Sequence, residues 1–254
     1  MLHRTNENTM KQLSACISRS PSPSLSLLAM EPGRALIDYL FSHLPRSRGR
    51  QGDGHPVIVY PGLGAGAWST GKLRNELTAA GFKAIDWGFG QNNGPRGSVE
   101  EWLKQLRDAA AAVQQSEQRT VSLLGWSLGG IYAREIARSA PSLVRQVITL
   151  GSPFAARPAD TNAGWLYKIL SGDKPSADHL KFTTKSLPVP STSIYSKSDG
   201  VVPWRGCLQP RGVQSENIEV EGVSHLGMGV NRDVMRLISN RLSQPEGAWH
   251  AFRR

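Results

Sequence analysis

Short apolar runs alternate with segments of helical spacing from residue 57 onward, and this alternation constrains the fold of the 254-residue chain more than any other feature. The runs expected to form strands are 57–60, 82–87, 121–124, 144–150, 193–195 and 217–220. Helices are expected at 31–44, 69–80, 98–115, 128–139 and 230–243. Strand–helix–strand units in this rhythm place parallel strands side by side and their helices on both faces. We therefore expect an α/β fold with a mostly parallel central sheet.

The remaining segments define the expected domain boundaries. Residues 1–30 are polar and rich in Ser and Pro, so we expect a disordered N-terminal extension. Residues 31–54 should hold a helix and a linker. The domain itself should span 55–245, with a small cap-like segment at 155–187, and a C-terminal tail should follow at 246–254.

The sequence GWSLG at residues 125–129 is the strongest chemical signal, because it fits G-x-S-x-G and lies between an expected strand and an expected helix. In such a nucleophile elbow, a tight turn lifts the serine hydroxyl above the sheet, and small residues flank it because neighbouring backbone comes close. Ser127 is therefore the candidate nucleophile. The N–H of Leu128, at the helix N-terminus, is a candidate donor to the developing oxyanion. In this context the sequence resembles the α/β-hydrolase superfamily, among its esterases and lipases.

In that superfamily the catalytic residues follow the order Ser, then Asp or Glu, then His, and two later positions fit. Asp199 lies in an Asp-Gly turn after the expected strand at 193–195, where it resembles the family's acid loop. His225 follows the expected strand at 217–220 and resembles the histidine loop. The other five histidines lie in the tail, before the elbow, in the irregular segment or near the C-terminus. The resemblance implies that His225 is the general base and that Asp199 orients it.

The resemblance covers about residues 55–245 and rests on five segments in the family's order: VIVYPGLG, SLLGWSLGG, VITLGSPF, YSKSDGVVPW and GVSHLGMG. It implies an α/β-hydrolase fold. It also implies a serine carboxylic-ester hydrolase, a carboxylesterase or lipase of the EC 3.1.1 type, that forms an acyl-enzyme on Ser127. Two alternatives stay open: an acyltransferase that uses the same three residues, and a hydrolase-fold protein that binds a ligand without catalysis.

The glycine-rich segment after the first expected strand has two interpretations. In the family this loop supplies the second oxyanion N–H, which makes Leu63 the candidate donor and Gly64 the next. The spacing Gly62-x-Gly64-x-x-Ala67 also fits the dinucleotide fingerprint, with Asp86 in the place of a ribose-binding acid. The serine, aspartate and histidine downstream favour the hydrolase, because a dinucleotide-binding domain has no use for them.

Composition limits the partners to be expected. The formal net charge of +10 is scattered, and no run of about five to eight basic residues occurs. We therefore expect a small acyl ester or lipid as substrate and no nucleic acid, while weak contact with an anionic membrane surface fits the charge. The two cysteines and six histidines are dispersed, so we expect no metal and no cofactor. Without an apolar run of about 18 residues or a convincing signal peptide, a cytoplasmic protein is expected.

Overall fold

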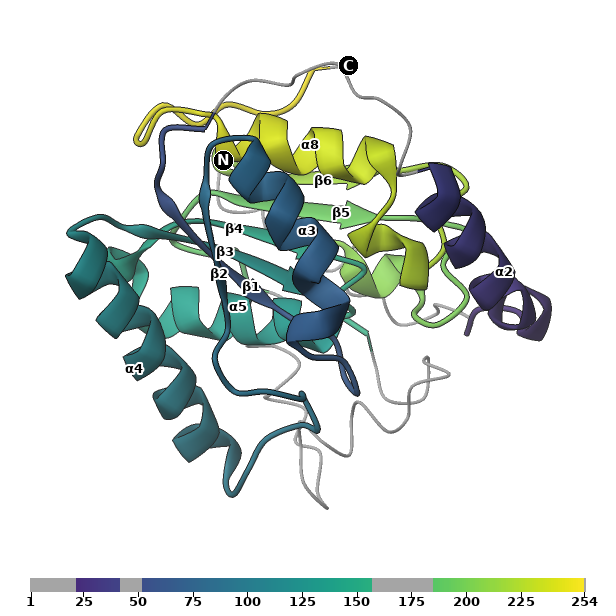
Figure 1. The fold of residues 1–254 in the computed structure, drawn as a ribbon, viewed down its shortest axis with the longest axis horizontal. Coiled ribbons are helices and arrows are strands. Elements are labelled where there is room, and N and C mark those ends of the chain that lie inside the picture. Colours follow the sequence, from purple (N-terminus) through teal and green to yellow (C-terminus); the bar gives the residue numbers. More distant parts are fainter. Residues whose placement is uncertain (1–21, 42–51, 157–184, 254) are drawn as a thin grey trace, which may run out of the picture.

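The computed structural model describes residues 22–41, 52–156 and 185–253. In these residues, six parallel strands form one sheet in the order β2-β1-β3-β4-β5-β6 (Figure 1). The strands are β1 (Pro56–Tyr60), β2 (Lys83–Asp86), β3 (Val121–Trp126), β4 (Val144–Leu150), β5 (Ser191–Tyr195) and β6 (Ser215–Glu219). The mostly parallel sheet is thus confirmed. Strand order reverses between β1 and β3, and ligand sites of open parallel sheets lie at such a reversal, beyond the carboxyl ends of the strands.

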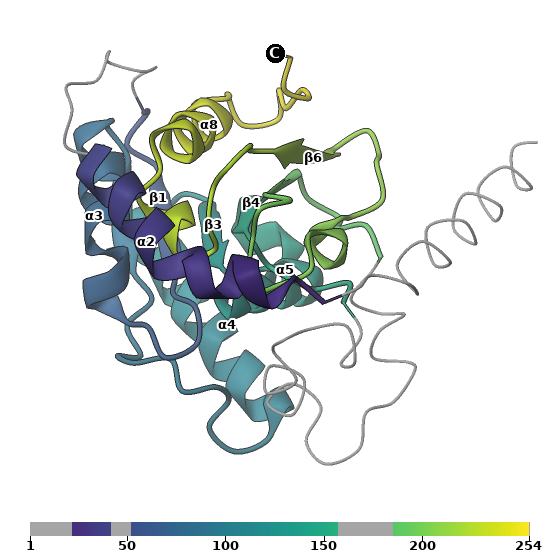
Figure 2. The same ribbon diagram turned by 90° about the vertical axis from the view of Figure 1, so that its right-hand side faces the viewer.

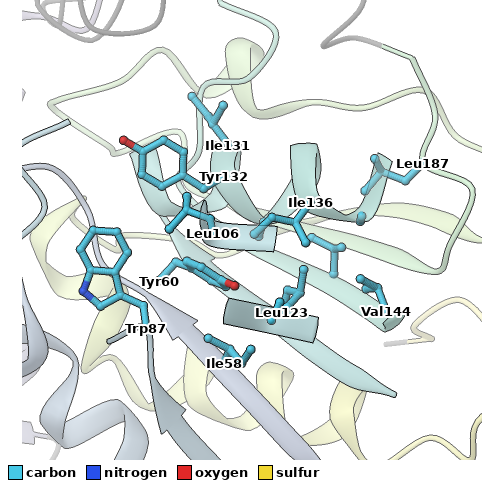
Figure 3. Close-up of a cluster of buried hydrophobic side chains, with 14 of the residues drawn as sticks. Ile58, Tyr60, Trp87, Leu106, Leu123, Ile131, Tyr132, Ile136, Val144 and Leu187 are labelled. Carbon is cyan, nitrogen blue, oxygen red and sulfur yellow. The ribbon is translucent and has the colours of Figure 1, made fainter. Parts of the chain in front are cut away.

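Helices cover both faces of the sheet, as the alternation predicts (Figure 1). They are α3 (Ala67–Ala79), α4 (Val99–Glu117), α5 (Leu128–Ser139) and α8 (Arg232–Leu242). Along β1, Val57 and Val59 pack with side chains of α3 and α8. Ile58 and Tyr60 point to the opposite face and pack with α4 and α5 (Figure 3). Because successive side chains of a strand alternate, both faces carry a packed core, and these cores hold the strand ends in place.

Local sequence signals account for helix boundaries. Ser98 caps α4, because its hydroxyl accepts a hydrogen bond from the N–H of Glu101 at 3.2 Å. Gly81 closes the turn after α3 with a φ of +94°, and its N–H donates to Thr78 O at 3.0 Å. The bounds of α5 and β4 coincide with those predicted from the sequence.

The N-terminal helix is longer than predicted. α2 spans Leu25–Phe41, so the prediction of disorder is wrong for residues 25–30. The hydroxyl of Ser24 accepts a hydrogen bond from Leu27 N at 3.3 Å, which starts the helix earlier than the sequence pattern suggested. Pro32, which would lie in the first turn of the predicted helix, is accommodated in the interior of α2 instead. Some predictions lie outside the described residues: residues 1–21 of the extension, residues 42–51 of the predicted helix and linker, and residues 157–184 of the cap-like segment.

α2 stands apart from the helices that flank the sheet. Figure 2 shows it crossing in front of the sheet, at the edge toward which the strand arrows of Figure 1 point. No helix within the described ranges is long and apolar enough to cross a membrane.

Candidate active site

Ser127 occupies a strained turn between β3 and α5. Its φ of 54° and ψ of −120° make it one of two non-glycine residues with positive φ among the described residues. Such conformations cost of order 1–3 kcal/mol and persist only when the surroundings enforce them. Here the N–H of Ser127 donates to Leu150 O at 2.9 Å, and the N–H of Gly130 donates to Ser127 O at 3.0 Å. The turn predicted from G-x-S-x-G is present, at the N-terminus of α5.

Glycines make this turn sterically possible. A Cβ on Gly125 would collide with the backbone of Gly130. A Cβ on Gly129 would collide with Tyr60 O and come within 2.7 Å of Pro61 O. The backbone of the elbow therefore packs against itself and against the end of β1, and any side chain at these positions would displace the serine.

Asp199 and His225 form a buried pair after β5 and β6. The Nδ1 atom of His225 lies 2.7 Å from Asp199 Oδ2. The other carboxylate oxygen of Asp199 accepts hydrogen bonds from the N–H groups of Val201 and Val202, both at 2.8 Å. The carboxylate is thus fixed by its own loop. A carboxylate accepts a proton-bearing Nδ1, and this tautomer leaves Nε2 free to act as a base.

The surroundings of His225 favour its protonated form. Burial lowers the pKa of the imidazole, but the charge and hydrogen bond of Asp199 and the charge of Glu31 outweigh it, so the pKa lies above the ordinary 6.5. An imidazole with this balance takes up a proton readily, as a general base must.

The three predicted residues meet at the carboxyl edge of the sheet. Ser127 N bonds to Leu150 O, and the next residue, Gly151, has a φ of +50° and lies against the pair. A Cβ on Gly151 would sit 3.1 Å from both Asp199 Oδ2 and His225 Nδ1. Among the described residues, Asp199 is hydrogen-bonded to His225. The Ser127 hydroxyl donates no hydrogen bond to any of them. Catalytic hydrogen bonds are often long in the absence of substrate and tighten in its complex.

The glycine loop after β1 lies against the candidate nucleophile. A Cβ on Gly62 would be 3.3 Å from Ser127 Cβ, so the backbone of the loop packs closely against the nucleophile. The N–H of Gly64 is occupied, because it donates to Asn92 O at 2.7 Å. In the described part of the chain the N–H of Leu63 has no acceptor. Of the two loop donors considered from the sequence, the geometry therefore favours Leu63.

The second expected donor, Leu128, is also uncommitted. Its N–H has no acceptor among the described residues and lies in the first turn of α5, directly after the nucleophile. Asn92 is a supporting residue that the sequence analysis missed. Its Nδ2 donates to Pro61 O at 2.8 Å and fixes the glycine loop. No local motif marks it, since Asn92 belongs to a loop far from β1 in the sequence.

The contacts of the same loop argue against the dinucleotide interpretation. The first glycine of the fingerprint, Gly62, faces Ser127. Asp86, the expected ribose ligand, accepts a hydrogen bond from Gly88 N at 3.1 Å and lies 4.0 Å from Arg74 Nε. In the described ranges no group of three or more His, Cys, Asp or Glu side chains is arranged to hold a metal ion.

Aromatic side chains border the site. Trp126 precedes the nucleophile and donates from Nε1 to His225 O at 3.2 Å. Trp204 stacks on Tyr195 with ring centroids 5.8 Å apart. Trp68, at the start of α3, is 79% exposed. Of these rings, Trp126 adjoins the candidate nucleophile and His225, and it is therefore the described candidate for apolar contact with an acyl group.

The fold and the site agree with comparisons to known proteins. The chain belongs to the Hydrolase_4 family, described as serine aminopeptidase S33, because the family model matches residues 55–202, more than half of the chain. This match begins at β1 and extends past Asp199. The resemblance to α/β hydrolases inferred from the motifs is confirmed.

Individual relatives are similar over shorter stretches. The serine hydrolase BPHL of Mus musculus is 30% identical over 116 residues, 43% of this chain and 40% of that protein. The pimeloyl-[acyl-carrier protein] methyl ester esterase of Citrobacter koseri is 34% identical over 115 residues, 43% of this chain and 41% of that enzyme. The chain thus matches less than half the length of these curated relatives. The solved monoacylglycerol lipase of Paleococcus ferrophilus has a TM-score of 0.53 at 17% identity, over 77% of this chain and 96% of that one. This likeness shows an α/β-hydrolase fold.

Proposed function

We propose that the protein is a serine carboxylic-ester hydrolase that works through an acyl-enzyme on Ser127. The observation that carries the proposal is the strained elbow at Ser127 on the sheet edge where Asp199 Oδ2 lies 2.7 Å from His225 Nδ1. A serine held in a costly conformation beside a buried Asp–His pair has no evident structural purpose.

The chemistry follows from these positions. His225 Nε2 takes the proton of the Ser127 hydroxyl as Oγ attacks the ester carbonyl carbon, and the carbonyl oxygen becomes an oxyanion. The N–H groups of Leu63 and Leu128 donate to this oxyanion. The C–O bond to the leaving alcohol then breaks, and the alcohol takes the proton back from His225. Water, deprotonated by the same imidazole, releases the acid and restores Ser127.

The substrate class is supported by relatives and by the edge of the site. The proteins that this chain resembles include a methyl ester esterase and a monoacylglycerol lipase. Trp126 offers apolar surface next to Ser127, which suits the acyl part of an ester or lipid. The name of the matched family refers to peptides, so an aminoacyl anilide belongs in the same assay as an alternative substrate.

The proposal is tested with p-nitrophenyl esters from acetate to palmitate, using the wild-type protein and Ser127→Ala. We expect turnover of at least one ester by the wild type and its loss in the variant, and the preferred chain length separates a carboxylesterase from a lipase. Turnover of the anilide alone would identify a peptidase instead. No turnover of any substrate, with no labelling of Ser127 by a fluorophosphonate, would favour a binding protein.

An acyltransferase with the same site is the second candidate. The same acyl-enzyme would be resolved by an alcohol or a thiol in place of water. Adding such acceptors to the ester assay and analysing the products decides between the two. A transferred acyl group that outweighs the free acid would identify an acyltransferase.

A further inference from the structure

One buried carboxylate, Glu31 of α2, connects the two loops that carry Asp199 and His225. The helix α2 crosses the carboxyl edge of the sheet (Figure 2), and Glu31 is 2% exposed. Glu31 Oε1 accepts hydrogen bonds from the N–H of Gly200 at 2.7 Å and of His225 at 2.9 Å. Glu31 Oε2 accepts one from Leu226 N at 3.0 Å. In these three hydrogen bonds the carboxylate only accepts, and each donor is a backbone N–H.

Arg34 of α2 binds the same two loops through their carbonyl groups. It lies one turn further along α2, on the face that carries Glu31. Its Nη1 donates to Ser198 O at 2.7 Å, and its Nη2 donates to Gly222 O at 2.8 Å. The backbone on both sides of Asp199 is therefore bound by α2, as is the backbone before and at His225. No sequence motif marks these contacts, because they join residues 164 to 195 positions apart.

The loops are shaped to receive α2. A Cβ on Gly200 would lie 2.5 Å from the carbonyl carbon and oxygen of Leu27. A Cβ on Gly227 would collide with the carboxylate of Asp38. Side chains at these two positions would push the helix away from the loops. The close docking of α2 is thus built into the residues that flank Asp199 and His225.

We propose that Glu31 is a positioning residue for the site, whose carboxylate fixes the acid loop and the histidine loop relative to each other through their backbone N–H groups. The inference rests on the proposed function of Ser127, His225 and Asp199. Glu31 touches no reacting atom. It acts by holding His225 where its ring can reach both Asp199 and Ser127, and small displacements of such a base cost large factors in rate.

The charge of Glu31 allows a second test of the proposal, through the pKa of His225. The charged groups that face His225 are Asp199, from the loop after β5, and Glu31, from α2, while Arg34 and Asp38 face the same loops further out. Burial lowers the pKa of His225, and the charges of Asp199 and Glu31 raise it. Loss of the Glu31 charge should therefore lower the pKa of His225. The acid limb of kcat/KM should then move to lower pH.

Glu31→Gln is the test variant, because it keeps the size of the side chain but removes the charge and turns one acceptor into a donor. We expect kcat to fall about 10- to 100-fold with KM within about 2-fold of the wild type. Asp38→Asn is the matched control on the same helix. Asp38 accepts from Asn231 Nδ2 at 2.8 Å, a contact with the start of α8, and its variant should keep kcat and the pH profile of the wild type.

The decisive measurement combines these kinetics with the NMR titration of the His225 ring in the wild type, Glu31→Gln and Asp38→Asn. A lower His225 pKa and a lower kcat in Glu31→Gln alone support the proposal. A kcat within about 2-fold of the wild type, an unchanged His225 pKa, or an equal loss in Asp38→Asn would overturn it.

If Glu31→Gln fails to fold, Glu31→Asp replaces it as the test variant. For Glu31→Asp we expect the wild-type His225 pKa and a reduced kcat, and an unchanged kcat would contradict the proposal. If the wild type turns over no ester, the proposed function fails, and the NMR titration still decides the role of Glu31 in setting His225.

Discussion

Two Ser–His–Asp arrays lie at opposite ends of the same parallel sheet. The carboxyl-end array consists of Ser127, His225 and Asp199, and the amino-end array consists of Ser122, His55 and Asp53. In the amino-end array His55 Nε2 lies 2.8 Å from the Ser122 hydroxyl, and His55 Nδ1 bonds to the Asp53 carboxylate. Judged by side-chain hydrogen bonds alone, the amino-end array is the more complete of the two.

The backbone of the two serines distinguishes the arrays. Ser122 lies within β3, paired with neighbouring strands, and both Ser122 and His55 are 0% exposed. Ser127 lies in the strained elbow, next to uncommitted N–H groups and close to Gly62 of the loop after β1. A substrate carbonyl needs donors for its oxyanion, and among the described residues the uncommitted N–H groups of Leu63 and Leu128 lie at the carboxyl end.

Electrostatics distinguishes the two histidines. Asp53 forms ion pairs with Arg119 at 2.8 Å and Arg145 at 2.9 Å. Burial lowers the pKa of His55, and the nearby arginine charges lower it further, so that this imidazole stays neutral despite its carboxylate. In the described part of the chain Asp199 has no arginine partner, and the pKa of His225 is raised. A hydrogen-bonded Ser–His–Asp array therefore serves the structure alone unless its carboxylate remains free to stabilise an imidazolium.

The largest effect should separate the two serines. Ser127→Ala should lower kcat by about 10⁶-fold, as loss of a nucleophile does, with little change in stability. Ser122→Ala should keep kcat within about 2-fold but lower the free energy of unfolding by about 1–3 kcal/mol, because it leaves buried His55 Nε2 without a partner. Ester turnover and chemical denaturation of both variants check this, and a large kcat loss in Ser122→Ala would break the comparison.

The next effect concerns the two aspartates. Asp199→Asn should lower kcat by about 10⁴-fold, because an amide cannot stabilise the imidazolium or hold the same tautomer. Asp53→Asn should leave kcat nearly unchanged, since its ion pairs with arginines lie at the far end of the sheet. The assay is single-ester kinetics with circular dichroism as the folding control. Equal losses in the two variants would show that distance from Ser127 does not matter.

A smaller effect should follow from crowding the Asp199–His225 pair. Gly151→Ala adds a Cβ 3.1 Å from both partners, and we expect kcat to fall about 10- to 100-fold. Gly88→Ala is the control, because Gly88 also has positive φ (84°) but nothing lies within 4 Å of its Cβ position. Both variants carry the backbone strain, so only the first should lose activity. Equal kcat values would mean that the pair tolerates displacement.

The smallest expected effects concern the pKa values of His225 and His55, which are shifted in opposite directions. The pKa of His225 lies above 6.5 and that of His55 below it, which NMR of the ring protons measures directly. The contribution of His225 to stability is therefore complete below pH 6.5 and lost as pH rises through its folded pKa. The contribution of His55 is present above pH 6.5 and lost as pH falls through its folded pKa. The rate should fall in acid as His225 is protonated. A higher pKa for His55 than for His225 would contradict the electrostatic distinction.

Local signals and strand order are sufficient to predict that Ser127, Asp199 and His225 lie at the same edge of the sheet; their role as an active site stays a prediction. Glycine spacing identifies Ser127, and the strands that precede Asp199 and His225 deliver both to one edge of a parallel sheet. The contacts that α2 makes with the site could not be predicted in this way. Glu31 reaches His225 across 194 positions, and its role depends on how α2 docks. Such long-range packing leaves no periodic or motif signal in a single sequence. The early start of α2 was missed for a different and local reason, because Pro32 is a residue expected in the first turn of a helix and not in its interior.

The most direct test of the account is labelling by a fluorophosphonate followed by peptide mass spectrometry, in the wild type, Ser122→Ala and Ser127→Ala. The probe bonds covalently to a serine that is activated by a neighbouring base and accessible to a substrate. We expect the label on Ser127 in the wild type and in Ser122→Ala, and none in Ser127→Ala. A label on Ser122, or an unlabelled Ser127 in the folded wild type, would contradict the assignment of the carboxyl-end array as the active site.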